Sequence, residues 1–192
     1  MKLFLILILT LSAYLSSQDY LDYPHPYHST ETTKGMVVSQ NYLSSDIGAE
    51  ILSKGGNAVD AAIAVGFSLT ATLPRAGNIG GGGFMLVYDK KTESIISFDF
   101  RSMSPKLATP DVYKVNGVHQ YELSEEGYKA IAVPGTVAGL IEAHEMFGTM
   151  DLADLVNPTI ELLKEGVPVT DDLYWAINDT ESLKKDQDKK KI

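Results

Sequence analysis

Arg101 is the side chain in this sequence whose type and position best suit ligand binding. It lies in the stretch FDFRSMSP, residues 98–105, just past an alternating apolar run that predicts a strand. A planar guanidinium can hold a carboxylate through two parallel hydrogen bonds. From its position alone, an arginine at a strand end is more often a partner in a surface ion pair, so both interpretations stay open at this point. Asp99, Ser102 and Ser104 lie close enough in sequence to support the Arg101 side chain.

The second unusual feature is a run of four glycines, Gly80, Gly81, Gly82 and Gly83. It lies in the segment GNIGGGGFMLVYD. A phosphate-binding loop needs a glycine-rich turn that opens onto a helix N-terminus, usually with a lysine and a serine or threonine after it. Here an apolar strand pattern follows, which argues against nucleotide binding. The apolar flanks also argue against a flexible linker. We therefore expect a structural role, in which the glycines allow main chain to pack closely against main chain.

The composition excludes several classes of protein. The chain has 192 residues, is 44% hydrophobic and 21% charged, and carries a net charge of −9. The hydrophobic and charged fractions are those of an ordinary globular protein. A protein that binds nucleic acid or an anionic membrane needs clustered positive charge. The acidic balance of this chain therefore argues against both partners. Because there is no cysteine, disulfides, thiolate metal sites and a cysteine nucleophile are all excluded.

The remaining candidates for binding chemistry are weak. His25 and His28 flank Pro26 and cannot share a helix face, and two ligands are too few for a structural metal site. We expect both histidines to be solvated, and we expect no metal and no cofactor. Arg75, just before the glycine run, is expected to be a solvated charge.

The chain is expected to begin with a targeting segment. Residues 1–17 have one lysine, then an apolar run and a stretch of small residues, which is the layout of a secretory signal peptide. The apolar run is shorter than the roughly 20 residues that a membrane span needs, so we expect no stable span after cleavage. Residues 18–34 predict a polar extended arm, and the folded part is expected from residue 35 onward. These features predict export to the periplasm or the extracellular space.

The elements around Arg101 and the glycines form an α+β pattern. We expect a strand at 35–40, a helix capped by Ser44 or Ser45, a buried helix capped by Asn57, and a hairpin with its turn at 89–94. Residues 104–129 predict surface loop with a short helix. A further helix is expected from about residue 136 to 147, followed by two short helices separated at Asn157–Pro158.

Four motifs occur together in one order: GGNAVDAAIAVGFSL, AGNIGGGGFMLVYD, FDFRSMSP and VPGTVAGL. Together they resemble the gamma-glutamyltranspeptidases, also called glutathione hydrolases, over roughly residues 35–175. The resemblance implies an N-terminal nucleophile hydrolase fold, a four-layer αββα sandwich, of which residues 35–192 would be the N-terminal part of the large subunit. It also implies that Arg101 binds the α-carboxylate of a gamma-glutamyl donor such as glutathione.

The resemblance further implies gamma-glutamyl acyl transfer, to water or to an amino acid or dipeptide, by an N-terminal threonine freed through self-cleavage. That threonine belongs to the family's small subunit, and none of Thr70, Thr136 and Thr170 is marked as a cleavage point. We therefore expect no catalytic residue on this chain, a missing C-terminal part or small subunit as its partner, and no activity of the chain alone. Two alternatives stay open: a secreted, non-catalytic carboxylate-binding module, and a non-functional gene fragment.

Overall fold

The computed structural model describes residues 31–180, so the expected signal peptide and most of the expected arm lie outside the described residues. The chain divides at Lys34–Gly35, and the elements below all belong to the part that starts at Gly35. Among the described helices, none is both long enough and apolar enough to cross a membrane.

Helix α2 spans Tyr42–Ser53 and is capped by Asn41, whose side chain accepts a hydrogen bond from the Leu43 N–H at 2.9 Å. The predicted cap at Ser44 or Ser45 is therefore wrong. Ser44 lies inside the helix and is buried, where its hydroxyl is 2.8 Å from that of Thr72. Residues 35–40 form no strand, so that prediction is wrong as well. The apolar side chain of Val37 packs against Gly48 of α2 instead of joining a sheet.

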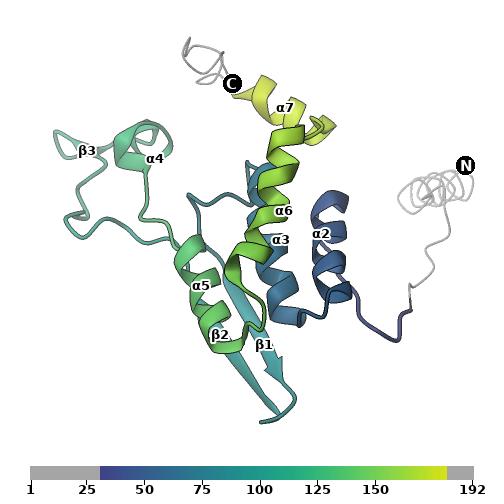
Figure 1. Ribbon diagram of the computed structural model, residues 1–192. Coiled ribbons are helices and arrows are strands. Elements are labelled where there is room, and N and C mark those ends of the chain that lie inside the picture. The colour runs from purple at the N-terminus through teal and green to yellow at the C-terminus, as the bar shows by residue number, and fades with distance from the viewer. Residues whose placement is uncertain (1–30, 181–192) are drawn as a thin grey trace, which may run out of the picture. The chain divides into compact units, whose positions relative to one another are not determined.

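Helix α3, Ala58–Thr72, confirms the predicted buried helix and its Asn57 cap. The Asn57 side chain accepts the N–H groups of Val59 and Asp60, and the Asp60 carboxylate accepts the N–H of Asn57. This reciprocal arrangement satisfies backbone donors that a helix start otherwise leaves open. Figure 1 shows α3 behind α6, with α2 on one side and α5 on the other.

Strands β1, Phe84–Asp89, and β2, Ser94–Asp99, form the predicted antiparallel hairpin. In β2 the predicted alternation is confirmed, because Phe98 is buried and Ile96 is half-buried while Ser97 and Asp99 are exposed. The ring of Phe98 meets the ring of Phe147 edge to face, with the centroids 6.2 Å apart. One face of the hairpin thus packs on helix α5, Thr136–Phe147.

The segment 104–132, here called the lobe, extends away from the helices (Figure 1). It contains the predicted short helix, α4, Glu122–Glu125, followed by a 3-10 turn, η1, Tyr128–Ala130. It also contains a small hairpin that we did not predict, β3, Lys114–Val115, paired with β4, Val118–His119. Asn116 and Gly117 form its two-residue turn, both with positive φ, which is the pattern of a tight hairpin turn.

Helix α6 runs unbroken over Leu152–Glu165 with Pro158 inside it, so the prediction of two short helices is wrong. Proline in a helix interior removes one backbone hydrogen bond. The helix continues because Leu155 and Thr159, on either side of Pro158, are both buried and α6 packs against α3. A last helix, α7, spans Asp171–Asp179 and is capped by the Thr170 hydroxyl, which accepts the Leu173 N–H.

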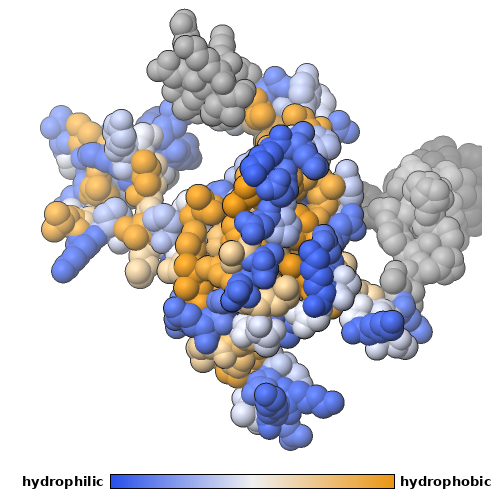
Figure 2. Space-filling view, viewed as in Figure 1, coloured by the Kyte–Doolittle hydropathy of each residue, from blue (hydrophilic) through white to orange (hydrophobic). Residues whose placement is uncertain are grey.

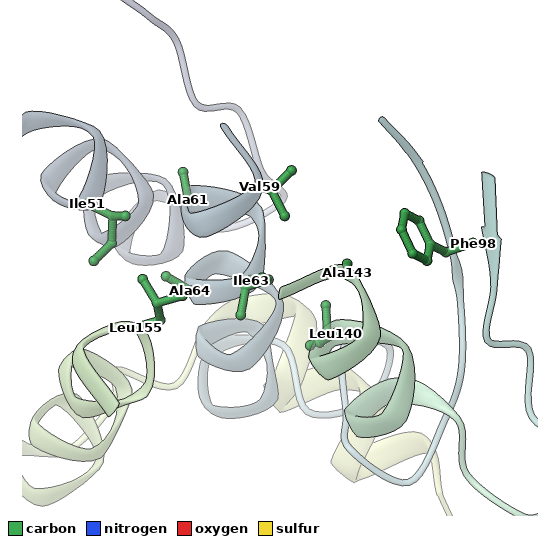
Figure 3. Packing of buried hydrophobic residues seen from close by; sticks show 9 residues of the cluster. All are labelled: Ile51, Val59, Ala61, Ile63, Ala64, Phe98, Leu140, Ala143 and Leu155. Atoms are coloured by element: carbon green, nitrogen blue, oxygen red, sulfur yellow. The ribbon is translucent and has the colours of Figure 1, made fainter. Parts of the chain in front are cut away.

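The hydrophobic core lies around α3 and mixes residues of four helices and one strand. Figure 3 shows Ile63 and Ala64 of α3 between Leu155 of α6 and Leu140 of α5, with Phe98 of β2 beyond them. Figure 2 shows hydrophilic side chains along α6 and α2, and apolar ones between them. The described part is thus an α+β structure, with helices on one face of the β1–β2 hairpin.

Candidate ligand-binding site

The three motif segments that contain the glycine run, Arg101 and the start of α5 meet at Phe100. Phe100 and Gly83 exchange two backbone hydrogen bonds, at 3.1 and 3.3 Å. The Gly81 carbonyl accepts the N–H groups of Gly135 and Thr136, at 2.8 and 3.2 Å. Backbone hydrogen bonds therefore hold together segments that are far apart in the sequence. They do so at the end of β2, where Arg101 lies.

Four glycines surround Phe100 so closely that a methyl group would not fit at any of them. A Cβ at Gly82 or at Gly135 would clash with the Phe100 carbonyl, and a Cβ at Gly83 or Gly139 would clash with the Phe100 ring. We call these residues, Gly82, Gly83, Gly135 and Gly139, the glycine seat. Main-chain packing of this kind is what a residue without a side chain permits.

The other two glycines of the run are in a different environment. A Cβ at Gly81 would meet nothing closer than 3.6 Å, and one at Gly80 would lie 3.1 Å from Oδ1 of Asn78. The loop leads directly into β1 and not into a helix, and the N-terminus of α5 that faces it is already hydrogen-bonded to the Gly81 carbonyl. The structural role expected for Gly80 and Gly81 stays a prediction.

The Arg101 side chain is exposed, and no hydrogen bond or ion pair holds its guanidinium within residues 31–180. Asp99 forms neither a hydrogen bond nor an ion pair with the guanidinium. Its Oδ1 accepts the backbone N–H of Arg101 at 3.0 Å, and neither Ser102 nor Ser104 hydrogen-bonds to the guanidinium. The donor groups of Arg101 are thus available to a ligand, while its backbone is held in place.

Arg75 is not the solvated charge that we expected. Its guanidinium forms two hydrogen bonds, each 2.6 Å, with the carboxylate of Asp172 on α7. This pair raises the pKa of Arg75 and lowers the pKa of Asp172 from their ordinary values. No local pattern indicated this partner, because Asp172 lies far along the chain and α7 was not predicted. The two arginines near the glycine run therefore differ: Arg75 is paired and Arg101 is not.

A pocket of about 230 Å³ lies beside the glycine run, lined by apolar residues of α3 and by Gly82, Phe100 and Thr136. Arg101 does not line it. A separate hollow of about 700 Å³ between α2 and α6 has several acidic side chains, among them Asp46, Asp154 and Glu161, and does not contact the motif segments. Within residues 31–180, no cluster of three acidic or histidine side chains is arranged to hold a metal ion. His25 and His28 lie outside the described residues.

The three threonines considered as nucleophiles all have structural hydrogen bonds. The Thr136 hydroxyl donates to the carbonyl of Asn78 at 3.2 Å, and the Thr70 hydroxyl donates to the carbonyl of Phe67 at 2.7 Å. Thr170 caps α7. Each hydroxyl is thus engaged with a backbone group, and within residues 31–180 none of the three is hydrogen-bonded to a basic or acidic side chain.

Comparison with known proteins agrees with the motifs that meet at the glycine seat. The family model of gamma-glutamyltranspeptidase matches residues 44–192. Glutathione hydrolase proenzymes are similar in sequence: that of Bacillus subtilis (strain 168) is 44% identical over 147 residues, and that of Escherichia coli (strain K12) is 42% identical over 148. These alignments cover 76% and 77% of this chain. The chain therefore belongs to the gamma-glutamyltranspeptidase family.

A solved structure with a similar fold is the gamma-glutamyltranspeptidase of Helicobacter pylori, with a TM-score of 0.80 and 37% sequence identity. That match covers 85% of this chain and 47% of the solved one. The chain spans about a quarter of the length of the two bacterial hydrolases, 25% of each. It thus corresponds to one part of the larger proteins in its family.

Proposed function

We propose that this chain is the N-terminal part of an exported enzyme that transfers or hydrolyses gamma-glutamyl groups, with glutathione among its donors. The observation that carries the proposal is the convergence of three family motifs on Phe100, next to an exposed arginine whose guanidinium has no partner in the described part of the chain. Export rests on the signal-like residues 1–17.

In this proposal Arg101 binds the α-carboxylate of the donor. Its planar guanidinium can form two parallel hydrogen bonds with a carboxylate. The nucleophile is the N-terminal threonine of the small subunit, in the part of the family that this chain does not span. The chain therefore supplies donor recognition, and the partner segment supplies the attacking group and the oxyanion donors.

The proposed architecture is the αββα sandwich of the N-terminal nucleophile hydrolases, with α2, α3, α5 and α6 in one outer layer. The β1–β2 hairpin supports this, because helices cover one of its faces while Phe84, Leu86, Tyr88 and Ile95 are exposed on the other. In a sandwich, that second face packs on another sheet.

Substitution of Arg101 in the full-length protein tests the role in donor binding. We expect Arg101→Ala to raise KM for a gamma-glutamyl anilide by about a hundredfold, since a charged hydrogen-bonded pair contributes roughly 1.5–3 kcal/mol. Arg101→Lys should recover only part of the loss, because an ammonium cannot make the two-pronged contact. Steady-state hydrolysis of the anilide measures both.

Arg75→Ala is the matched control, since it removes the nearby arginine that is already paired with Asp172. We expect KM to stay within about twofold of the wild type, because the Arg75 guanidinium is already bound by Asp172 and has no part in the proposed donor contact. An unchanged KM in Arg101→Ala would overturn the proposed role of Arg101. A full-length protein that binds glutamate without turning over the anilide would favour the non-catalytic binding module.

A further inference from the structure

The backbone of Arg101 is enclosed from two sides by glycines of different segments. A Cβ at Gly82 would clash with the Phe100 carbonyl, the Arg101 carbonyl carbon and the Ser102 nitrogen. A Cβ at Gly135 would clash with the Phe100 carbonyl and would lie 3.4 Å from the Arg101 oxygen. These atoms belong to the two peptide groups on either side of the Arg101 Cα. Close packing against Gly82 and Gly135 therefore fixes the position of the Arg101 Cα, from which the side chain extends.

The residue before Arg101 is fixed as well. The Phe100 ring packs against Gly83 and Gly139, and its backbone is hydrogen-bonded in both directions to Gly83. On the exposed side, Oδ1 of Asp99 accepts the Arg101 N–H. The main chain thus has little freedom to turn, although the guanidinium itself has no partner in the described residues.

We propose that Gly82 and Gly135, with Asp99, are positioning residues that aim Arg101 at the substrate carboxylate; this inference rests on the proposed function. A long side chain loses less freedom on binding when its backbone is already fixed. A displacement of about 1 Å at a binding group can lower the rate of a reaction by about a hundredfold. The glycine seat then contributes to the affinity for the gamma-glutamyl donor as well as to packing around Phe100.

Substitution within the glycine run tests the inference. We expect Gly82→Ala in the full-length protein to raise KM for the anilide about tenfold or more with a smaller change in kcat, because the methyl group displaces the Arg101 backbone. Gly81→Ala is the matched control. Its methyl group would meet only ordinary contacts, so KM should stay within about twofold.

A double-mutant cycle with Arg101→Ala separates positioning from a general loss of structure. If Gly82 acts through Arg101, Gly82→Ala should change KM by less than about twofold once Arg101 is alanine. The same increase in KM in both backgrounds would overturn the inference.

Asp99 provides a second test that does not depend on packing, because Asp99 is exposed and its replacement leaves the glycine seat intact. Asp99→Ala removes the acceptor of the Arg101 N–H and should raise KM about threefold to tenfold, as for one hydrogen bond. Asp99→Asn keeps an acceptor oxygen and should restore KM to near the wild-type value. If Asp99→Ala leaves KM unchanged, the role of Asp99 is overturned.

The experiments distinguish this inference from the proposed function. If Arg101→Ala itself has no effect on KM, the proposed function fails and the positioning role fails with it. If Arg101→Ala raises KM but Gly82→Ala and Asp99→Ala do not, only the positioning role is overturned.

Discussion

At the scale of single residues, Asp60 shows how a buried charge can be accommodated. Its side chain has no exposed surface, yet its carboxylate accepts hydrogen bonds from the N–H groups of Asn57, Thr149 and Met150 and from the Thr149 hydroxyl. Burial by itself raises the pKa of Asp60, but the hydrogen bonds from Thr149, Asn57 and Met150 outweigh it, so the pKa lies below its ordinary value. Asp60 thereby ties the start of α3 to the turn between α5 and α6.

The lowered pKa of Asp60 predicts a dependence of stability on pH. The folded pKa lies below the unfolded value of about 3.9, so the contribution is complete above that pH and is lost as pH falls through the folded pKa. Asp60→Asn should lower the free energy of unfolding by about 2–3 kcal/mol at pH 7, because an amide cannot accept all four hydrogen bonds. Its stability should also depend less on pH in the acid range.

Urea unfolding at a series of pH values measures both effects. Asp46→Asn, an exposed carboxylate on α2, is the control and should change stability by less than about 0.5 kcal/mol. Equal acid sensitivity in wild type and Asp60→Asn would show that the Asp60 carboxylate does not contribute as described.

At the scale of elements, α6 carries the clearest testable feature, a proline inside an unbroken helix. Pro158 lacks the N–H that would bond to the Asp154 carbonyl, which costs up to about 3 kcal/mol in a helix interior. Pro158→Ala should therefore raise the free energy of unfolding by about 1–2 kcal/mol. If Pro158 instead began a separate helix, the same change would be neutral or destabilising. Thermal unfolding of the two proteins decides between these outcomes.

Local signals were enough to predict several elements. Three elements carry local signals for where they begin, how their apolar residues repeat and where they end. They are the helix after Asn57, the strand with the alternation from Ile95 to Phe100 and the helix ending at Phe147. Predictions failed where tertiary packing overrode a local preference. Val37 packs on α2 and not in a sheet, and the burial of Leu155 and Thr159 on α3 outweighs the break expected at Pro158.

The candidate site was predictable only in part. Arg101 was predicted as a ligand-binding residue from its type and motif, and this stays a prediction. The glycine seat depends on Gly135 and Gly139, whose approach to Phe100 no local pattern reveals. The Arg75–Asp172 pair was missed for the same reason, since its partners are brought together by the packing of α7. The turn Asn116-Gly117 was a signal for the β3–β4 hairpin that the sequence did contain.

At the scale of the whole molecule, the outer face of the β1–β2 hairpin is an exposed apolar surface that no described segment covers. Leu86 is 73% exposed and Ile95 is 69% exposed, beside Phe84 and Tyr88 on the same face. A contiguous apolar face of this kind marks an interaction surface or a liability to aggregate. It is the surface that a second sheet would cover in the proposed sandwich.

Leu86→Lys tests that proposal. In the 192-residue chain the change should leave the free energy of unfolding within about 0.5 kcal/mol, because the side chain is exposed, and should reduce binding of an apolar dye. In the full-length protein it should prevent stable folding, because a buried unpaired lysine costs several kcal/mol. Leu163→Lys, on the exposed side of α6, is the control and should be tolerated in both proteins. Tolerance of Leu86→Lys in the full-length protein would contradict a covering sheet.

The glycine seat also has a consequence for the order of events during synthesis. The hairpin and the glycine run are complete once Arg101 has been made, but Gly135 and Gly139 follow only after the whole lobe. Closing such a long loop costs chain entropy, and it cannot happen before α5 has been made. In the role proposed for Arg101, a nascent chain that stops before α5 would display this arginine on an unclosed backbone, and carboxylate binding would begin only after α5 has docked. Measuring the glutamate affinity of successively longer chains would then show at which chain length α5 docks.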